Sequence, residues 1–187
     1  MNVTGVILAG GKSSRMGTDK GLIDLDGKPM ITHVINVLQK VASKVIIIAN
    51  NPSYNQFNLE VYPDLFPEKG PVGGIYTALN CSKTEKNIIL SCDTPFVNEK
   101  LLNNLLLQSK DYEITVSKFK NKIHPLIGVY SQSVKTIFEE NLNKNRLKLG
   151  LVNQQTELNI VHYNDCDFDE KIFFNINTPT ELKECKS

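Results

Sequence analysis

Residues 3–20 read VTGVILAGGKSSRMGTDK and predict a strand followed by a glycine-rich loop. This stretch opens with a short apolar run rich in β-branched residues, which predicts a buried strand over residues 3–9. The strand ends at Gly10 and Gly11, which lack the Cβ atoms that would keep a ligand away from the backbone. The glycine pair therefore predicts a bend at which a ligand can approach the main chain.

Three cationic side chains follow the bend within one loop, namely Lys12, Arg15 and Lys20. Exposed backbone N–H groups and several cations together suit a polyphosphate. Two familiar phosphate motifs do not match. A Walker A loop would need glycine where the chain has Val6, and the residues after Gly10-Gly11 lack the Rossmann spacing. The loop therefore predicts a phosphate site of another type.

The composition describes an ordinary globular protein, and we expect one domain over residues 1–187. A net charge of +1 provides no basic field, which argues against nucleic acid as a partner. No apolar stretch approaches the roughly 18 residues of a membrane span, and because Met1-Asn2 leads directly into a strand pattern we expect no signal peptide. The four cysteines form no CxxC pair, which argues against zinc and predicts a reducing, cytoplasmic location.

Strand and helix patterns alternate along the chain. Helical spacing of apolar residues predicts helices at 30–41, 71–80, 133–142, after an N-cap at Asn98, and from Thr180. Apolar or alternating runs predict strands at 45–49, 59–62, 87–91, 112–117, 126–130 and 158–163. We expect a lysine-rich loop at 118–122, a loop or a short helix interrupted by Gly150 at 144–155, and an extended segment at 173–179. This alternation predicts a single three-layer α/β domain with a mostly parallel, Rossmann-like sheet flanked by helices.

Such a sheet also predicts where a ligand binds, because open parallel sheets take ligands beyond the carboxyl ends of their strands. Residues 10–20, Asn50, Asp64 and Asp93 each follow a predicted strand, so we expect them to converge. Two carboxylates would then face three cations. A carboxylate oxygen is the ligand that Mg²⁺ prefers, so this edge predicts a metal–nucleotide site.

The opening loop has a specific pattern: Leu8-Ala9-Gly10-Gly11, then Arg15-Met16-Gly17, then Lys20. It resembles the signature loop of nucleotidyltransferases that move a nucleoside monophosphate from an NTP to a phosphorylated acceptor. Further segments, in order over residues 8–179, resemble the molybdenum cofactor guanylyltransferase family. They are Asp19-Lys20-Gly21, Asp26-Gly27-Lys28-Pro29, Gly70-Pro71-Val72-Gly73-Gly74, Cys92-Asp93-Thr94-Pro95, His124-Pro125, and Asn175 with Asn177-Thr178-Pro179.

The resemblance implies a reaction, a cofactor and partners. GMP would pass from GTP to the terminal phosphate of Mo-molybdopterin, which forms the guanine dinucleotide cofactor and releases pyrophosphate. Mg²⁺ would assist, and other cofactor-biosynthesis proteins and acceptor enzymes would make transient contacts. The acceptor phosphate is already anionic at neutral pH, so positioning and charge neutralisation should carry the rate without a general base.

The resemblance also implies residue roles. Leu8, Ala9, Gly10 and Gly11 would contact the guanine nucleotide, Lys20 and Arg15 the phosphates, Asn50 the nucleoside and Asp64 the guanine site, while Asp93 would hold Mg²⁺ and Asn175 and Asn177 would face molybdopterin. Arg15, Lys20 and Asp93 would then be the catalytic residues. The chain departs from the family before Arg146, where Lys144-Asn145 stands in place of a usual glycine, and this weakens the acceptor-side assignment.

Other interpretations remain open at this point. The enzyme could use CTP or a sugar phosphate, or the chain could be a GTP-binding regulator that performs no chemistry. Asp93 could cap the next helix, Asp64 could only shape a turn, and Asn175 and Asn177 could cap the last helix. Lys12 could be simply solvated, and His124 receives no acid–base role.

Overall fold

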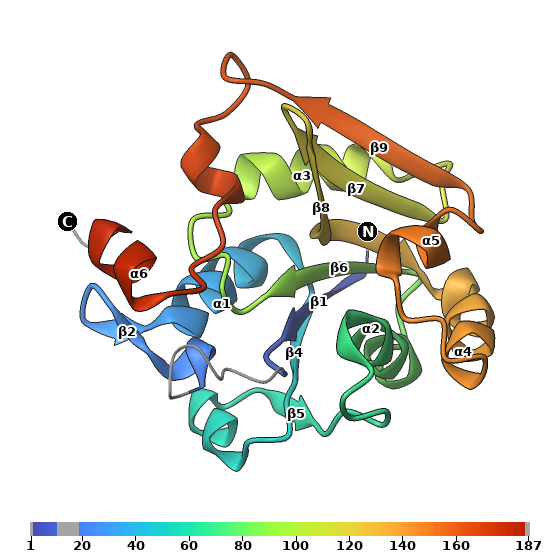
Figure 1. The fold of residues 1–187 in the computed structure, drawn as a ribbon, viewed down its shortest axis with the longest axis horizontal. Helices are drawn as coiled ribbons and strands as arrows, with labels where there is room; N and C mark the ends of the chain where they lie inside the picture. Colours follow the sequence, from blue (N-terminus) through green and yellow to red (C-terminus); the bar gives the residue numbers. More distant parts are fainter. Residues whose placement is uncertain (1, 11–18, 186–187) are drawn as a thin grey trace.

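A seven-stranded sheet forms the centre of the structure, a computed structural model that describes residues 2–10 and 19–185 (Figure 1). Across the sheet the strands are β5 (Glu60–Tyr62), β4 (Lys44–Ile48), β1 (Val3–Leu8), β6 (Lys86–Ser91), β8 (Lys122–Ser131), β7 (Ile114–Phe119) and β9 (Leu158–Tyr163). Of these strands, β8 runs opposite to its two neighbours, and every other pairing is parallel. The predicted, mostly parallel sheet is confirmed.

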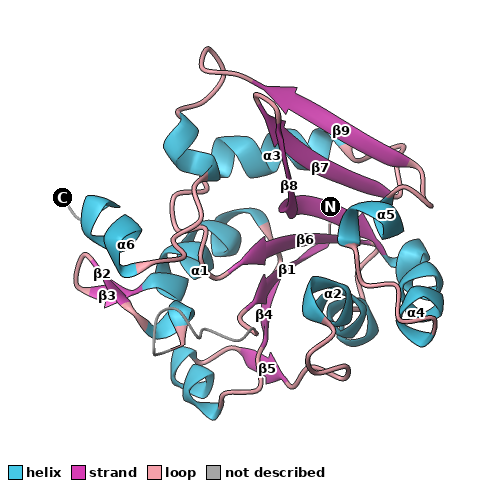
Figure 2. Ribbon diagram, in the orientation of Figure 1, coloured by secondary structure: helices cyan, strands magenta, loops and turns pink. Residues whose placement is uncertain are grey.

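Helices cover both faces of the sheet (Figure 2). One face carries α1 (Met30–Val41) and α3 (Glu99–Gln108), and the other carries α2 (Gly70–Cys81), α4 (Lys135–Asn143) and α5 (Leu149–Asn153). Successive side chains of β1 point to opposite faces, so Ile7 joins the core under α1 while Val6 joins the core under α2. The three-layer arrangement is therefore also confirmed.

The predicted helix at 30–41 and the predicted strand at 158–163 agree with the structure at both ends. Their apolar patterns are long and regular, so the buried face is determined locally. A small hairpin of β2 (Asp24–Leu25) and β3 (Lys28–Pro29) precedes α1, and its turn places Asp26 and Gly27 at positive φ.

The expected lysine-rich loop at 118–122 is wrong. Strands β7 and β8 extend through this region and leave Lys120 and Asn121 as a two-residue turn. The Phe119 side chain is buried and stacks on Phe173 with the ring centroids 4.7 Å apart. The distant aromatic partner therefore continues the strand where the local composition favoured a loop.

Two further expectations need correction near the end of the chain. Gly150 lies inside α5 and does not interrupt it. The segment expected to be extended from residue 173 begins instead with a 3₁₀ turn, Glu170–Phe173, before the chain straightens. Among the helices of the described ranges, none has the length and apolarity needed to cross a bilayer.

The last helix, α6 (Pro179–Cys185), returns to the carboxyl edge of the sheet and lies beside the β2–β3 hairpin (Figure 1). The contact is apolar: Ile176 is fully buried with Leu25 and Met30, and Leu182 packs against them. The backbone N–H of Ile176 also donates to the Asp93 carbonyl at 2.9 Å. The end of the chain is thereby joined to the segment that follows β6.

Candidate active site

Three neighbouring parallel strands end together at one edge of the sheet. Leu8 of β1 is in register with Ile48 of β4 and with Ser91 of β6. The ladder continues one residue further, because Ala9 donates to the Ile48 carbonyl at 2.9 Å and Cys92 to the Leu8 carbonyl at 3.1 Å. The loops that begin here therefore start side by side, as parallel pairing requires.

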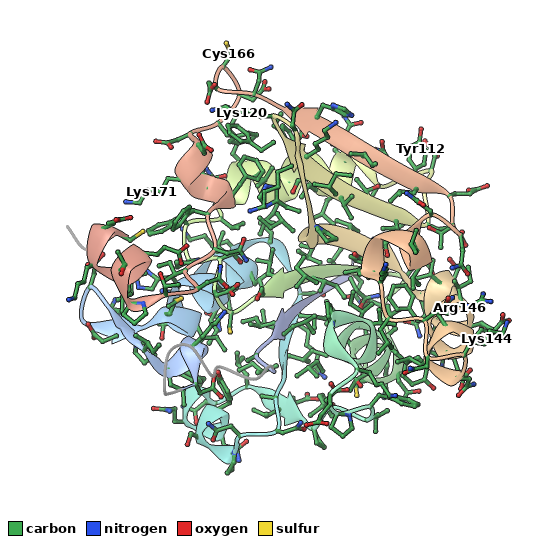
Figure 3. All side chains as sticks on the ribbon, viewed as in Figure 1. Tyr112, Lys120, Lys144, Arg146, Cys166 and Lys171 are labelled. Carbon is green, nitrogen blue, oxygen red and sulfur yellow. The ribbon has the colours of Figure 1, made fainter. Side chains whose placement is uncertain are left out.

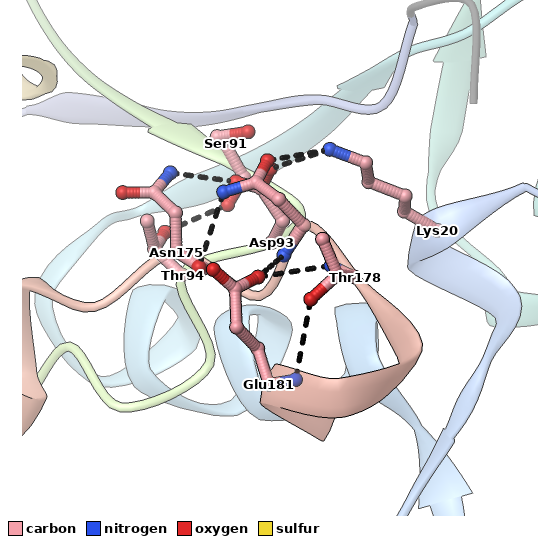
Figure 4. Close-up of polar contacts among 8 residues, drawn as sticks. Lys20, Ser91, Asp93, Thr94, Asn175, Thr178 and Glu181 are labelled. Carbon is pink, nitrogen blue, oxygen red and sulfur yellow. Dashed lines mark hydrogen bonds and ion pairs between the residues drawn. The ribbon is translucent and has the colours of Figure 1, made fainter. Parts of the chain in front are cut away.

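Asp93 lies at the centre of a polar cluster on this edge (Figure 4). Its side chain is about one-tenth exposed, and Lys20 Nζ lies 3.3 Å from its Oδ2. Asn175 Nδ2 donates to Asp93 Oδ1 at 2.9 Å, and Lys20 Nζ donates to Asn177 Oδ1 at 2.7 Å. Side chains from three distant parts of the chain thus hold one carboxylate and one ammonium group in place.

A capping box holds the asparagine segment. Glu181 Oε2 accepts from the backbone N–H groups of Asn177 at 2.7 Å and Thr178 at 2.9 Å, while Glu181 N–H donates to Thr178 Oγ1 at 3.2 Å. The hydrogen bond from the Asn177 backbone lowers the pKa of Glu181. Thr178 and Glu181 therefore cap α6, and the Asn175 and Asn177 side chains instead contact Asp93 and Lys20.

Asp93 does not cap the helix that follows it. Asn98 Oδ1 accepts from the Leu101 backbone N–H at 2.9 Å and is the N-cap of α3. The preceding Cys92 is buried, and this burial raises the pKa of its thiol far above the ordinary value. The thiol therefore stays protonated and unreactive.

A cavity of about 210 Å³ opens beside the ends of β1, β4 and β6. It is lined by Leu8, Gly10, Ile48, Asp64, Gly70, Pro71, Gly74, Ser91 and Leu126. Asp64 Oδ1 accepts from the Phe66 backbone N–H at 3.0 Å and from Thr77 Oγ1 at 2.9 Å. Asp64 therefore shapes a turn and also lines the cavity.

A second hollow, of about 360 Å³, lies on the other side of Gly10 and includes Ala9, Asp19 and Asn50 in its lining. Among the residues that the structure describes, none has an atom within 4 Å of the place that a Cβ on Gly10 would take, so these residues leave the backbone open to a ligand there. Asn50 Oδ1 accepts from the Asp64 backbone N–H at 2.9 Å. This bond ties the residues that follow β4 and β5 into one wall.

The third hollow, of about 400 Å³, lies on the opposite side of the Asp93 cluster, towards the β7–β8 hairpin. Its lining includes Asn175 and Asn177, two lysines of the hairpin, and the Phe119 and Phe173 rings; the lysines are Lys120 and Lys122. Lys120 and Lys171 lie on the hairpin side of the molecule, whereas Arg146 lies far away beside α4 (Figure 3). Arg146 therefore does not reach this hollow.

His124 also lines the third hollow and is buried against the Phe173 ring, with the ring centroids 5.3 Å apart. Burial, helped by the nearby Lys122 charge, lowers the pKa of His124 to about 4. The imidazole is therefore neutral near pH 7, where it can donate or accept a hydrogen bond but carries no charge.

Several of the predicted residues form two groups at this edge. Lys20, Asn175 and Asn177 lie around Asp93, and Leu8, Gly10 and Asp64 line the 210 Å³ cavity. Gly11, Lys12 and Arg15 lie outside the described residues. Within the described ranges, no group of three or more His, Cys, Asp or Glu side chains could hold a metal. Asp93 is the carboxylate that the sequence predicts as a ligand, and Mg²⁺ sites with one or two protein carboxylates are completed by substrate phosphates and water.

Sequence reasoning missed three residues at this edge. The Thr-x-x-Glu spacing of Thr178 and Glu181 is a capping-box signal that could have been found. The third is Tyr54, whose hydroxyl donates to Asp19 in the lining of the second hollow. It gave no local signal, since an isolated tyrosine in a polar segment predicts nothing specific.

Comparisons with known proteins identify the family and the fold. Residues 5–157 match the family described as "MobA-like NTP transferase domain". A "probable molybdenum cofactor guanylyltransferase" of Carboxydothermus hydrogenoformans is 37% identical over 98% of this chain and 94% of its own length. A protein of Flavobacterium johnsoniae with the same description is 41% identical over 79% of this chain and 78% of its own length.

A solved structure shares the fold. It is the molybdopterin-guanine dinucleotide biosynthesis protein A of Archaeoglobus fulgidus, and its TM-score is 0.80. The alignment covers 98% of this chain and 96% of that one at 23% identity. This likeness extends over the full sheet and its flanking helices.

Proposed function

This chain belongs to the MobA-like NTP transferase family, and on that premise we propose that it transfers GMP from GTP to the terminal phosphate of Mo-molybdopterin, with release of pyrophosphate. The observation that carries the proposal is the Lys20–Asp93 pair, whose partners Asn175 and Asn177 line one hollow. Ser91, two residues before Asp93, lines another. One hollow suits a nucleotide and the other suits a large anionic acceptor. A transfer reaction needs both substrates to meet at a charged centre.

The guanine nucleotide would take the side of the 210 Å³ cavity. Leu8 and Gly10 offer an apolar wall and an open backbone there, and Asp64 offers a carboxylate to the N–H groups of a base. Asn50 would contact the nucleoside from the adjoining hollow. The phosphates would then extend towards Lys20. Ala9 would complete the proposed nucleotide site, together with Gly11 and Arg15, whose roles rest on the family resemblance alone.

The acceptor would occupy the 400 Å³ hollow beyond Asp93. Asn175 and Asn177 line it together with Lys122, which adds positive charge, whereas the Lys120 ammonium is paired with Asp165 at 3.2 Å and Glu170 at 2.9 Å. Two stacked phenylalanine rings provide a flat apolar wall. This combination suits a molecule with a planar ring system and an anionic phosphate, as molybdopterin has.

We propose Mg²⁺ as the metal, with Asp93 as its protein ligand. Asn175 orients the Asp93 carboxylate, and the burial of that carboxylate restricts the access of competing water. When bound, the ion would neutralise phosphate charge and polarise the α-phosphoryl group. Lys20 would carry out the same neutralisation from the protein side, since its ammonium already lies at this carboxylate.

The remaining residues position the reactants and move no proton. The acceptor phosphate is an anion at neutral pH, so its attack requires no base. His124 is neutral there because its pKa is lowered to about 4, and it would serve as a hydrogen-bonding wall of the acceptor hollow. Rate enhancement would then come from holding two anions in line and offsetting their repulsion.

The test is pyrophosphate release by the purified protein with each NTP, with and without Mg²⁺ and Mo-molybdopterin. We expect release with GTP only when both the metal and the acceptor are present. Asp93→Ala should abolish transfer, whereas Asp111→Ala, which removes an exposed carboxylate in a turn, should leave it unchanged. Normal product formation by Asp93→Ala would refute the metal role.

The alternatives predict other outcomes of the same assay. A preference for CTP, or turnover with a sugar phosphate, would assign the chain to another branch of the nucleotidyltransferases. GTP binding without any pyrophosphate release would instead indicate a regulator that performs no chemistry.

A further inference from the structure

A buried tyrosine lies beneath the backbone turn that carries Lys20. Tyr54 belongs to the 3₁₀ helix Pro52–Phe57, which follows β4, and its side chain is fully buried. Its hydroxyl donates to Asp19 Oδ1, and Asn51 Nδ2 donates to Asp19 Oδ2 at 3.2 Å. Both carboxylate oxygens of Asp19 are therefore held by residues of one short segment.

The same hydroxyl also lies against Gly21. A Cβ built on Gly21 would come within 2.5 Å of the Tyr54 hydroxyl oxygen, which is far closer than a real Cβ can lie. The hydroxyl thus fills the space that any side chain at position 21 would need. Tyr54 contacts the residue before Lys20 and the residue after it.

The turn between these contacts is a single 3₁₀ turn, Lys20–Leu22. The Leu22 N–H donates to the Asp19 carbonyl at 3.0 Å, and the Ile23 N–H donates to the Lys20 carbonyl at 3.2 Å. These two bonds and the Tyr54 contacts determine where the Cα–Cβ bond of Lys20 points. Its ammonium then reaches Asp93 at 3.3 Å and Asn177 at 2.7 Å.

A lysine side chain has four rotatable bonds and loses rotamer entropy when it is ordered. When the backbone of Lys20 is held in place, the side chain has fewer orientations to lose as its ammonium becomes ordered. We propose that Tyr54 is a positioning residue for Lys20. The Tyr54 hydroxyl holds the turn from Asp19 to Gly21 in place and so directs the Lys20 ammonium towards the reacting phosphates. This inference rests on the proposed function, since it assumes that Lys20 contacts the nucleotide.

Tyr54 acts here through the hydrogen bonds of its hydroxyl and not as an acid. Burial raises the pKa of Tyr54 far above its ordinary value, and the nearby Asp19 carboxylate adds to the effect. The hydroxyl therefore keeps its proton near neutral pH. It donates to Asp19 and exchanges no proton with substrate.

The first experiment is Tyr54→Phe, which removes the hydroxyl and keeps the buried ring. We expect kcat/KM for GTP to fall about tenfold, because a hydrogen bond to a charged group is lost. The matched control is Tyr76→Phe, which breaks a 3.0 Å hydroxyl-to-carboxylate bond between Tyr76 and Glu139, on α2 and α4. The control should retain wild-type kcat/KM.

The second experiment is a double-mutant cycle with Lys20→Ala. If Tyr54 acts through Lys20, adding Tyr54→Phe to Lys20→Ala should lower kcat/KM by less than about twofold. A general structural role would lower it by the same factor in both backgrounds. Equal factors would overturn the proposal, as would a wild-type kcat/KM for Tyr54→Phe itself.

A third variant tests the contact with Gly21. Gly21→Ala should lower kcat/KM in the wild type, because the new Cβ displaces the Tyr54 hydroxyl. The same substitution should be milder in the Tyr54→Phe background, where the nearest ring carbons would lie 3.2 Å from that Cβ. An identical effect in both backgrounds would count against the proposed lock.

Measurement of the GTP dissociation constant without acceptor separates this inference from the proposed function. Coupling between Tyr54→Phe and Lys20→Ala in binding needs no catalysis. If the wild type transfers no GMP, yet the two substitutions are coupled in their effect on the GTP dissociation constant, the proposed function fails and the positioning role stands. If it transfers GMP while the two substitutions act independently, the positioning role fails.

Discussion

Lys20 shows how much one side chain depends on distant partners. Its place in the opening loop predicts a phosphate contact, but the sequence does not predict that Asn177, 157 positions later, accepts from its ammonium at 2.7 Å. Asp93 lies 3.3 Å away, so the ammonium has both a charged and a neutral partner. Lys20 is thereby ordered at the place where the proposed phosphates arrive.

We predict that Lys20→Ala lowers the rate of transfer on the order of 10²–10³, because one preorganised charge at the phosphates is lost. The measurement is kcat for pyrophosphate release with GTP and acceptor. Lys40→Ala, which removes an exposed lysine on α1, is the matched control and should have no effect. A fall of less than about fivefold for Lys20→Ala would show that Lys20 is not catalytic.

The loop between β5 and α2 contributes Asp64 to the wall of the 210 Å³ cavity. This loop can pack closely on α2 because Gly73 of the helix has no side chain. A Cβ on Gly73 would lie 2.7 Å from the Phe66 carbonyl oxygen. That neighbour is backbone and cannot rotate away. Glycine at position 73 therefore lets the loop with Asp64 dock on α2, where Thr77 holds the Asp64 carboxylate.

We predict that Gly73→Ala destabilises the fold by about 1–3 kcal/mol and raises KM for GTP, because the loop must move outward. Chemical denaturation and initial-rate kinetics measure the two effects. The control is Gly150→Ala in α5, where no atom of the described residues lies within 4 Å of the new Cβ. Helix propensity should make this control neutral or more stable by up to about 1 kcal/mol. Wild-type stability of Gly73→Ala would contradict the docking argument.

At the scale of the whole molecule, the C-terminal segment completes the candidate site. The family match ends at residue 157, whereas Asn175 and Asn177 come from the segment after β9. That segment crosses the molecule, contributes Phe173 to the wall of the acceptor hollow, and returns to Asp93. The site is therefore a property of the entire fold.

His124 gives this part of the molecule a pH dependence. Its pKa is about 4 in the folded protein, against about 6.5 when unfolded, because burial disfavours the charged imidazole. The unfolded chain then binds more protons between these values, so stability is full above pH 6.5 and falls as the pH falls towards 4. We expect a loss of about 1–3 kcal/mol over this window.

Thermal unfolding of wild type and His124→Gln between pH 7.5 and pH 4.5 measures this effect. The wild type should lose more stability than the variant over that range. Only the wild type has this imidazole, which is neutral when buried in the folded protein and binds a proton when the chain unfolds. His162→Gln, which removes an exposed histidine on β9, should follow the wild type. Parallel curves for wild type and His124→Gln would refute the assignment.

Local pattern alone was enough for most of the fold. The helix at 30–41 and the strand at 158–163 follow from apolar spacing, and the alternation of elements predicts the parallel three-layer sheet. The parallel topology in turn places Asp64 and Asp93 at the same edge as Gly10. These features depend on near neighbours in the chain, whose periodicity the amino-acid sequence records directly.

Only the tertiary structure decided which side chains meet. The β7–β8 strands continue through the lysine-rich segment because Phe119 finds Phe173, and Asn175 turns to Asp93 because Thr178 and Glu181 cap the helix instead. Tyr54 reaches Asp19 across 35 positions of chain. No local pattern encodes such contacts, because they depend on the packing of all the intervening elements.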